Sequence, residues 1–324
     1  MARPERIGVI GAGAFGTALA ISQARAGRPV VLWARNPDHA AEMARTRENR
    51  ARLPGVTLPD GISPTSDFTV AASASVLLLA VPTQTLRGVL APQGTMLDRR
   101  MLVACSKGVE MGTGLLPDEI IAACAPGAQT AVLTGPGFAA DIAQDKPTAL
   151  TLATTAPGAE ALQTALSTRN LRLYLSDDPT GAQLGGALKN VIAIAAGITM
   201  AAGLGESARA ALMTRGFAEI TRFAESRNAR TETLLGLSGF GDLVLTCTSG
   251  KSRNYRHGLT IGKGVTPDGD QTVEGVMTAH AMAAVSDPDT LPVTSMVSAL
   301  LNGKVTLDDA IDLLLSRPLK RERD

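Results

Sequence analysis

One lysine lies in an otherwise apolar stretch of the chain. Residues 184–200 read LGGALKNVIAIAAGITM, and Lys189 and Asn190 are their only strongly polar side chains. The run has helical length, and an interior this apolar usually packs in a core. An ammonium group there must find partners, become neutral or face a polar cavity. Burial and cationic neighbours bring a lysine pKa toward the range useful for proton transfer, which makes Lys189 a candidate acid–base group. A lysine that reaches solvent from a helix edge is the competing interpretation.

Two further polar clusters could serve the same chemistry. Asp242 lies among glycines in GFGDLVLTCT at 239–248, where an aspartate could instead simply cap a helix. Residues 249–257, SGKSRNYRH, concentrate cations with hydroxyl and amide donors in a short turn. An arginine there could hold a phosphate bidentately, although most charge-rich turns are solvated surface loops.

A glycine-rich turn near the N-terminus predicts a nucleotide site. A strand at residues 6–10 leads into GAGAFG at 11–16 and then into a helix. Gly11 permits the tight turn, Gly13 lets a pyrophosphate approach the backbone, and Gly16 lets the helix pack close to the strand. The helix N-terminus offers free N–H groups to the phosphates. Between a strand and a helix, this motif favours a dinucleotide site over a turn without a ligand.

The end of the second expected strand, residues 29–33, indicates which dinucleotide. NAD-specific sites usually place Asp or Glu there to hold the ribose 2′-hydroxyl, whereas this chain has Arg35 after Trp33-Ala34. An arginine can pair with a 2′-phosphate and stack on adenine. We therefore expect NADP(H) as the preferred cofactor and NAD(H) as the alternative. A solvated charge at a strand end is the other interpretation of Arg35.

Further apolar runs predict an α/β Rossmann-type doubly wound parallel sheet. The expected strands are residues 75–80, 101–105 and 131–134, with possible edge strands at 148–152 and 171–175 and a helix at 159–166 between them. Ligands of open parallel sheets bind at the carboxyl ends of the strands. Lys107 and the loop 135–139 follow two such ends, so we expect them to face the same crevice as the glycine loop.

The second half of the chain predicts an all-α C-terminal domain. Alanine-rich helices are expected at 180–202, 206–227, 273–284, 295–301 and 307–315, with Thr180 as N-cap of the first. The polar turn SDDPT at 176–180 marks the expected boundary. We expect a dinucleotide-binding domain at 1–178 and a helical substrate-binding and catalytic domain at 179–324.

Composition narrows the class of protein. The chain has 324 residues, 45% of them hydrophobic and 19% charged, which is typical of a soluble globular protein with two domains. The net charge of +1 and the aromatic content of 3% argue against a nucleic-acid partner. The three cysteines fit a reducing compartment and suggest no metal motif. We expect a cytoplasmic protein without a signal peptide, a metal or a stable membrane association.

Taken in order, these motifs resemble the bacterial-type NAD(P)-dependent sn-glycerol-3-phosphate dehydrogenases. The resemblance is carried by GAGAFGTALA at 11–20, VPTQTLR at 81–87, SKGVE at 106–110, GPGFA at 135–139, GGALKNVIAIAAGI at 185–198, TRGFAEI at 214–220, GDLVLTCTS at 241–249, SRN at 252–254 and VEGV at 273–276. It covers nearly the whole chain apart from the C-terminal segment. It implies reversible reduction of dihydroxyacetone phosphate to sn-glycerol 3-phosphate for phospholipid synthesis, a Rossmann domain followed by a helical domain, and a homodimer.

The resemblance also implies roles for individual residues. Lys189 matches the acid–base lysine of the family, assisted by Lys107 and Asp242. The expected substrate contacts are Lys107, Gly135, Gly137, Lys189, Asn190, Asp242, Thr246, Ser252, Arg253 and Asn254. The expected cofactor contacts are Gly11, Gly13, Ala14, Phe15, Gly16, Arg35, Pro82, Lys107, Ala139, Arg253, Thr272 and Glu274. The small substrate would be phosphorylated.

Three positions depart from the family pattern. Gln183 stands where Glu is common, Gly137 where Ser or Thr is common, and Ser207 where Asn is common. None of them removes a residue essential to the chemistry, but substrate affinity and the electrostatics around Lys189 depend on what they contact.

Two other functions remain as alternatives. A β-hydroxyacid dehydrogenase or ketopantoate-type reductase would also join a Rossmann domain to helices and use a lysine, but would bind a carboxylate substrate. An NADP(H)-binding protein without turnover would bind the nucleotide and react with nothing. The SRN cluster and segment 239–248 favour the enzyme that binds a phosphate.

Overall fold

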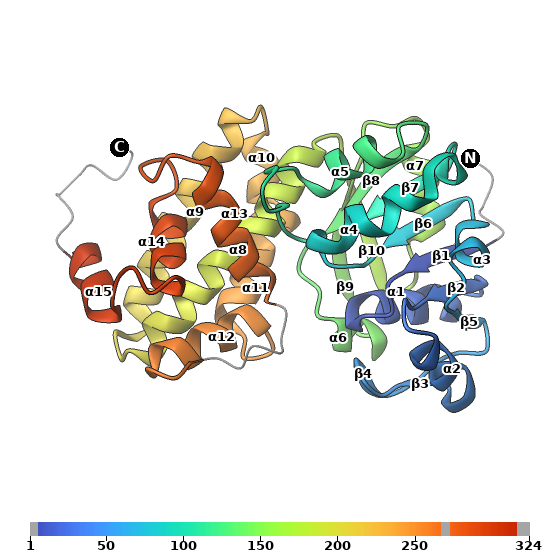
Figure 1. Cartoon of the computed structure of the whole chain (residues 1–324), viewed down its shortest axis with the longest axis horizontal. Coiled ribbons are helices and arrows are strands. Elements are labelled where there is room, and N and C mark those ends of the chain that lie inside the picture. Colours follow the sequence, from blue (N-terminus) through green and yellow to red (C-terminus); the bar gives the residue numbers. More distant parts are fainter. Residues whose placement is uncertain (1–5, 267–272, 316–324) are drawn as a thin grey trace.

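A computed structural model describes residues 6–266 and 273–315 of the chain, in which a sheet half and a helical half lie side by side (Figure 1). The halves follow one another along the chain. The last strand of the sheet ends at Ser176, and the long helix α8 (Pro179–Ala201) begins three residues later. The predicted fold class, a Rossmann-type sheet followed by a helical region, is confirmed.

The main sheet has eight strands in the order β10-β9-β8-β7-β6-β1-β2-β5. Their bounds are β1 (Ile7–Ile10), β2 (Val30–Trp33), β5 (Ile62–Thr65), β6 (Val76–Leu79), β7 (Met101–Ala104), β8 (Gln129–Thr134), β9 (Thr148–Ala153) and β10 (Leu171–Ser176). From β1 the chain builds outward through β2 to β5, and it then crosses to the other side of β1 to form β6. The strand order therefore reverses between β1 and β6, where open α/β sheets bind their ligands.

The strand register aligns the carboxyl ends of the central strands. Ile10 lies opposite both Trp33 of β2 and Leu79 of β6, and Leu79 in turn lies opposite Ala104 of β7. The segments that leave these strands therefore begin at one edge of the sheet. They include the glycine loop and Lys107, as the sequence predicts.

One strand pairing departs from the predicted parallel sheet. The strands β8 and β9 are antiparallel, with Thr134 opposite Thr151, whereas β9 and β10 are parallel to each other. The connection from β8 to β9 contains the short helix α6 (Ala139–Ala143) and stays at one edge of the sheet, so β9 must run back. The result keeps the loop 135–139 at the edge where the other strands end.

Helices cover both faces of the sheet, as Figure 1 shows. One face packs on α1 (Ala14–Arg25), α6 and α7 (Ala159–Leu166), and the other on α3 (Phe68–Ala72), α4 (Thr83–Leu90) and α5 (Pro117–Cys124). Neighbouring strand residues alternate between the two cores, because side chains point to opposite faces: Leu78 belongs to one and Leu79 to the other.

The segment between β2 and the edge strand β5 was not anticipated from the sequence. It contains α2 (Pro37–Thr46) and a two-stranded antiparallel hairpin, β3 (Glu48–Asn49) and β4 (Leu53–Thr57). The strands are short and carry proline and glycine, so their apolar pattern is too weak to read. A short 3₁₀ segment, η1 (Ala91–Leu97), also follows α4.

The helical half surrounds α8. Its other elements are α9 (Gly205–Ser226), α10 (Thr231–Leu235), the π turn η2 (Leu237–Gly241), α11 (Asp242–Thr248), α12 (Arg253–Gly262), α13 (Glu274–Val285), α14 (Pro292–Leu301) and α15 (Leu307–Leu315). Two sequence predictions were wrong here. Asp178, not Thr180, caps α8, because its Oδ1 accepts the Gly181 N–H at 2.8 Å and Pro179 occupies the first helical position. The predicted charged turn 249–257 is also mostly helix, since α12 begins at Arg253.

Candidate active site

Lys189 lies inside the protein rather than at a solvent-exposed helix edge. It belongs to α8, and the residue is 5% exposed. The helices α9, α11, α12 and α13 all pack on α8, which explains why an almost uninterrupted run of small and aliphatic side chains forms it. The alternative of a lysine reaching solvent is excluded, and the ammonium group must be held by partners within the fold.

Asp242 provides that partner from α11. The π turn before it approaches α8 closely: a Cβ atom on Gly185 would lie 2.9 Å from the Gly239 Cα atom. This close backbone approach places Asp242, 1% exposed, beside Lys189. Asp242 Oδ1 accepts a hydrogen bond from Lys189 Nζ at 2.8 Å. Asp242 is the first residue of α11, but its carboxylate binds Lys189 and does not serve as a helix cap.

Lys107 reaches the same carboxylate from the sheet half. Its Nζ donates to Asp242 Oδ2 at 2.6 Å and to the Gly135 carbonyl oxygen at 2.9 Å. One buried carboxylate therefore bridges two ammonium groups, one on each oxygen. Because Lys107 follows β7 and Asp242 belongs to the helical half, this ion pair also fixes the two halves at the edge of the sheet.

The protons on Lys189 can be accounted for individually. Nζ donates to Asp242 Oδ1 and to Thr246 Oγ1, the latter at 2.5 Å. The Thr246 hydroxyl donates in turn to Asp242 Oδ1 at 3.3 Å. A lysine ammonium has three N–H bonds. Within residues 6–266 and 273–315 these are its two acceptors, so one N–H remains for a substrate oxygen.

The surroundings lower the pKa of Lys189 to about 8. Burial is the largest cause, because it penalises the charged form. The Asp242 carboxylate raises the pKa, and the neighbouring Lys107 ammonium lowers it. The resulting value lies near neutral pH, where an acid can both hold a proton and release it efficiently.

Amide side chains continue the site along α8 and α12. Asn254 Nδ2 donates to Asn190 Oδ1 at 2.8 Å, and Asn254 Oδ1 accepts the Gly275 N–H at 3.0 Å. Ser252 caps α12 by accepting the Tyr255 N–H. The cap leaves Arg253 exposed at the start of α12, so Ser252 acts on the helix and Arg253 is available to an anion.

The glycine loop has the geometry that a dinucleotide requires. Gly11 has φ +114°, and a Cβ atom on Gly16 would lie 2.1 Å from the Gly11 carbonyl oxygen. Other residues would strain the first position and clash at the second. A Cβ atom on Gly13 would meet nothing within 4 Å, so space beside this backbone is open for a pyrophosphate.

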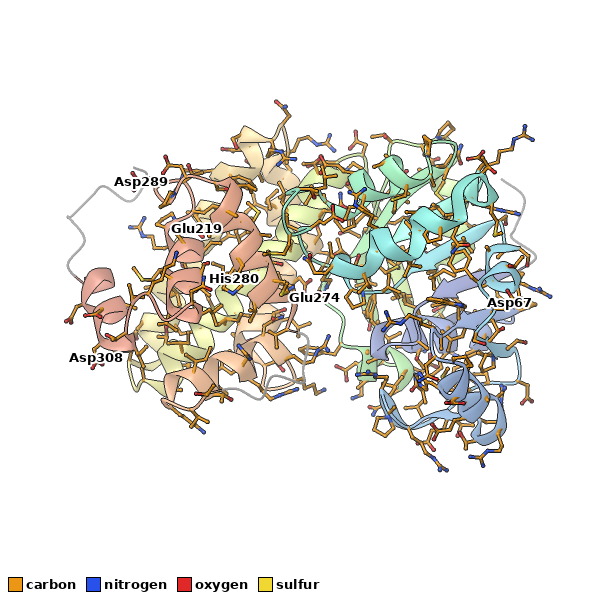
Figure 2. The ribbon with its side chains drawn as sticks, in the orientation of Figure 1. Asp67, Glu219, Glu274, His280, Asp289 and Asp308 are labelled. Carbon is orange, nitrogen blue, oxygen red and sulfur yellow. The ribbon has the colours of Figure 1, made fainter. Side chains whose placement is uncertain are left out.

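The remaining predicted cofactor residues gather at helix starts and strand ends. Ala14 and Phe15 open α1, Pro82 precedes α4, Ala139 opens α6 and Glu274 opens α13, while Arg35 is exposed after β2. Figure 2 shows Glu274 at the border of the helical half that faces the sheet half. Burial raises the pKa of Glu274, and the charges of Arg253, Lys107 and Lys189 lower it. Thr272 lies outside the described residues.

The three departures from the family pattern do not touch the lysine pair. Gln183 Oε1 accepts the Asp118 N–H at 3.0 Å, so this amide joins α8 to the start of α5. The three atoms nearest to a Cβ atom on Gly137 would be methyl carbons of Thr148, Ile142 and Leu150. Ser207 is exposed near the start of α9. We conclude that none of the three alters the charge around Lys189 by direct contact.

Sequence reasoning missed the residues that hold the Lys107 loop. Gln84 of α4 donates to the Val109 carbonyl oxygen and accepts the Met111 N–H. Arg87, one turn later, makes two hydrogen bonds with the Glu110 carboxylate, at 2.9 and 2.8 Å. A signal was present, because Gln84 and Arg87 lie in the motif VPTQTLR and Glu110 lies in SKGVE, but the spacing alone did not reveal the contact.

Among the described residues, no group of three or more His, Cys, Asp or Glu side chains could hold a metal ion. Within the part of the chain that the structure describes, one helix, α8, is long and apolar enough by length and composition to cross a membrane, but 89% of its qualifying 18-residue stretch is buried inside the protein. A helix in the core of a protein can be equally long and apolar, and α8 has the packing of a core helix.

Comparison with known proteins identifies a consistent set of relatives. Residues 6–159 match the family described as NAD-dependent glycerol-3-phosphate dehydrogenase N-terminus, and residues 178–312 match its C-terminus. The chain is 54% identical to glycerol-3-phosphate dehydrogenase [NAD(P)+] of Ruegeria sp. (strain TM1040), with 98% of this chain and 99% of the relative covered. It is 55% identical to glycerol-3-phosphate dehydrogenase [NAD(P)+] of Cereibacter sphaeroides, with 98% of this chain and 100% of the relative covered. The crystal structure of glycerol-3-phosphate dehydrogenase from Coxiella burnetii superposes with a TM-score of 0.92 at 34% identity, covering 97% of this chain and 99% of that one.

Proposed function

The chain belongs to the NAD-dependent glycerol-3-phosphate dehydrogenase family, and we propose on that basis that it reversibly reduces dihydroxyacetone phosphate to sn-glycerol 3-phosphate with NAD(P)H. The product would supply glycerophospholipid synthesis. The observation that supports this chemistry best is the Asp242 carboxylate, which holds Lys189 on one oxygen and Lys107 on the other.

Lys189 is the proton donor in reduction. Two of its N–H bonds are fixed by Asp242 and Thr246, which leaves the third to donate to the substrate carbonyl oxygen. As negative charge develops on that oxygen, Lys189 transfers the proton and becomes a neutral amine. In the reverse reaction the neutral amine takes the hydroxyl proton. A pKa of about 8 lets the same group serve both directions near neutral pH.

Lys107 and Asn190 stabilise the developing alkoxide. Lys107 brings a second positive charge to the same buried carboxylate, and Asn190 is the residue after the proton donor on α8. Charges and dipoles already fixed before reaction are worth most in a site that excludes water. The Asp242 carboxylate offsets the positive charge that the two lysines bring together.

Arg253 and Asn254 fix the phosphate end of the substrate. Arg253 is exposed in the first turn of α12, where its guanidinium and the free backbone N–H groups favour an anion. Asn254 is already held by Asn190 and the Gly275 N–H, which ties this end of the site to the residue beside Lys189. A fixed distance between phosphate and ketone places the carbonyl carbon for reaction. We propose Gly135, Gly137, Thr246 and Ser252 as the other residues that shape the substrate site.

The cofactor site is proposed along the carboxyl edge of the sheet. The open backbone at Gly13 and the free N–H groups of the first turn of α1 fit a pyrophosphate. When bound there, the nicotinamide supplies the hydride. We propose Arg35 as the residue that binds the 2′-phosphate and makes NADP(H) the preferred cofactor, with NAD(H) also used. Gly11, Gly16, Ala14, Phe15, Pro82, Lys107, Ala139, Arg253, Thr272 and Glu274 would complete the nucleotide contacts.

The proposal also covers the domain division, the assembly and the location of the protein. The chain divides into a dinucleotide-binding domain at 1–178 and a helical substrate-binding domain at 179–324. It acts as a homodimer in the cytoplasm, without a stable membrane association.

Two alternative functions are not favoured: a dehydrogenase that acts on a carboxylate, and a nucleotide-binding protein without turnover. Lys107, Asp242 and Lys189, the three groups of the proton-transfer site, are all present and in contact.

The test is an absorbance assay at about 340 nm, the band of reduced nicotinamides. Purified protein is mixed with NADPH or NADH and with dihydroxyacetone phosphate, a β-keto acid or ketopantoate. We expect NADPH to be consumed with dihydroxyacetone phosphate and not with the carboxylates. Turnover of a carboxylate alone, or nucleotide binding without any turnover, would overturn the proposed function.

A further inference from the structure

A buried asparagine lies directly behind the glycine loop. Asn49 belongs to β3 of the small hairpin, and its exposed fraction is 0%. Its Nδ2 donates to the Ala12 carbonyl oxygen at 3.0 Å and to Thr17 Oγ1 at 2.7 Å. One amide group therefore binds both the loop before α1 and the first turn of α1, although Asn49 lies 37 residues after Ala12 in the sequence.

The orientation of this amide is fixed by its partners. The Ala12 carbonyl oxygen can only accept, so the Asn49 atom that faces it must be the nitrogen. Asn49 Oδ1 then faces His39 Nε2 at 2.9 Å, and it can only accept. His39, from α2, must therefore carry its proton on Nε2 and donate it to Asn49. Both N–H donors and the carbonyl oxygen of the Asn49 side chain are therefore engaged, which fixes one orientation of the amide.

The consequence for the loop follows from peptide geometry. No peptide bond between described residues is cis, and in a trans peptide the C=O and N–H groups point in opposite directions. The Ala12 carbonyl points toward Asn49, so the N–H of Gly13, which shares that peptide plane, points away from it. Space beside Gly13 is open. A carbonyl turned toward that space would instead repel a phosphate.

We infer that Asn49 is a positioning residue of the dinucleotide site and is held in place by His39. This inference rests on the proposed nucleotide binding. It keeps the Ala12 carbonyl turned away from the phosphates and the Gly13 N–H turned toward them. The hairpin that carries Asn49 is thereby part of the cofactor site without touching the cofactor. The same argument assigns a role to the β3–β4 hairpin, which lies between β2 and β5 in the chain but pairs with no strand of the main sheet.

The test compares Asn49→Asp with two other variants. Aspartate has the same shape but no donor, and its carboxylate faces the Ala12 oxygen. His39→Ala leaves both Asn49 donor bonds in place and removes the group that orients them. Gln23→Ala is the matched control, because Gln23 is a buried amide of the same helix α1 that donates to the Leu166 carbonyl oxygen, away from the glycine loop.

Dissociation constants for NADPH and NADH are measured by nucleotide fluorescence, with folding checked by circular dichroism and thermal unfolding. We expect Asn49→Asp to weaken both nucleotides by the same factor, about tenfold to a hundredfold, because the pyrophosphate is common to both. His39→Ala should weaken both less, and Gln23→Ala should lower the melting temperature without changing either constant. At saturating NADPH, kcat of Asn49→Asp should stay within about threefold of the parent, because Lys189 is untouched.

Two results would overturn the inference. One is a folded Asn49→Asp protein that binds both nucleotides as the parent does. The other is a loss of affinity in Gln23→Ala and His39→Ala that simply follows the loss of stability in each. If the parent protein itself binds neither nucleotide, the proposed function fails instead, so the two failures are distinguishable.

Discussion

Replacing Asp242 by asparagine should move the pH dependence of reduction. Asp242 Oδ1 lies 2.8 Å from Lys189 Nζ, and the carboxylate raises the pKa of that lysine against the effect of burial. Two unit charges about 4 Å apart interact by about 4 kcal/mol at an effective dielectric constant of about 20, equivalent to about three pKa units. Asparagine keeps a dipole, so we expect the pKa of Lys189 to fall by about two units in this variant.

The sign of the effect follows from the role of the proton. Reduction needs protonated Lys189, so activity is present below its pKa and is lost as pH rises through it. With a pKa of about 8, roughly nine in ten molecules are protonated at pH 7, and a fall of about two units would leave roughly one in ten. Asp242→Asn should thus lose about tenfold at pH 7 from protonation alone and recover part of it at lower pH.

The assay is the pH profile of kcat/KM for dihydroxyacetone phosphate at saturating NADPH. Thr246→Val is the matched control, because it removes a hydroxyl partner of Lys189 but no charge. In Thr246→Val, the pH at which kcat/KM falls on the alkaline side should stay near that of the parent. In Asp242→Asn, this fall should move to lower pH. A folded Asp242→Asn protein that binds NADPH and keeps the parental pH profile would refute the electrostatic reasoning.

Three further predictions concern other charged residues of the proposed site and of the loop that carries Lys107. Lys107→Met should move the same alkaline fall to higher pH, because the Lys107 ammonium lowers the pKa of Lys189; a downward shift in the pH profile would contradict this. Arg35→Asp should reduce kcat/KM with NADPH far more than with NADH, and an equal loss with both would remove Arg35 from cofactor selection. Glu110→Gln should lower the urea midpoint by the equivalent of about 0.5–1 kcal/mol, since Arg87 is 38% exposed, and should lower kcat by loosening the Lys107 loop. Unchanged stability together with unchanged kcat would show that this ion pair does not hold the loop.

Much of the architecture follows from short-range sequence patterns. Continuous apolar runs such as residues 76–79 predict buried parallel strands, and the glycines at 11, 13 and 16 define the turn from β1 into α1. These patterns are local, so a single sequence contains them completely. The reversed direction of β9 depends on where the chain turns after Phe138, which no periodicity encodes.

The sequence predicted the individual residues of the candidate site better than the contacts between them. An apolar helix made Lys189 conspicuous, and the family motifs supplied Lys107 and Asp242 as candidates. That one carboxylate would bridge both lysines depends on contacts between residues 53 and 135 positions apart, which local patterns do not report. Asn49 illustrates the same limit, because its neighbours in sequence give no hint that it supports the glycine loop.

The most direct test of the proposed mechanism is the chemical step of Lys189→Met, a variant of similar size without a proton to give. Single-turnover reduction of dihydroxyacetone phosphate is followed with bound NADPH in excess protein. We expect a rate lower by about 10²- to 10⁴-fold, the usual contribution of a general acid, with NADPH affinity unchanged. A rate close to that of the parent would contradict the account, because the proton would then come from elsewhere.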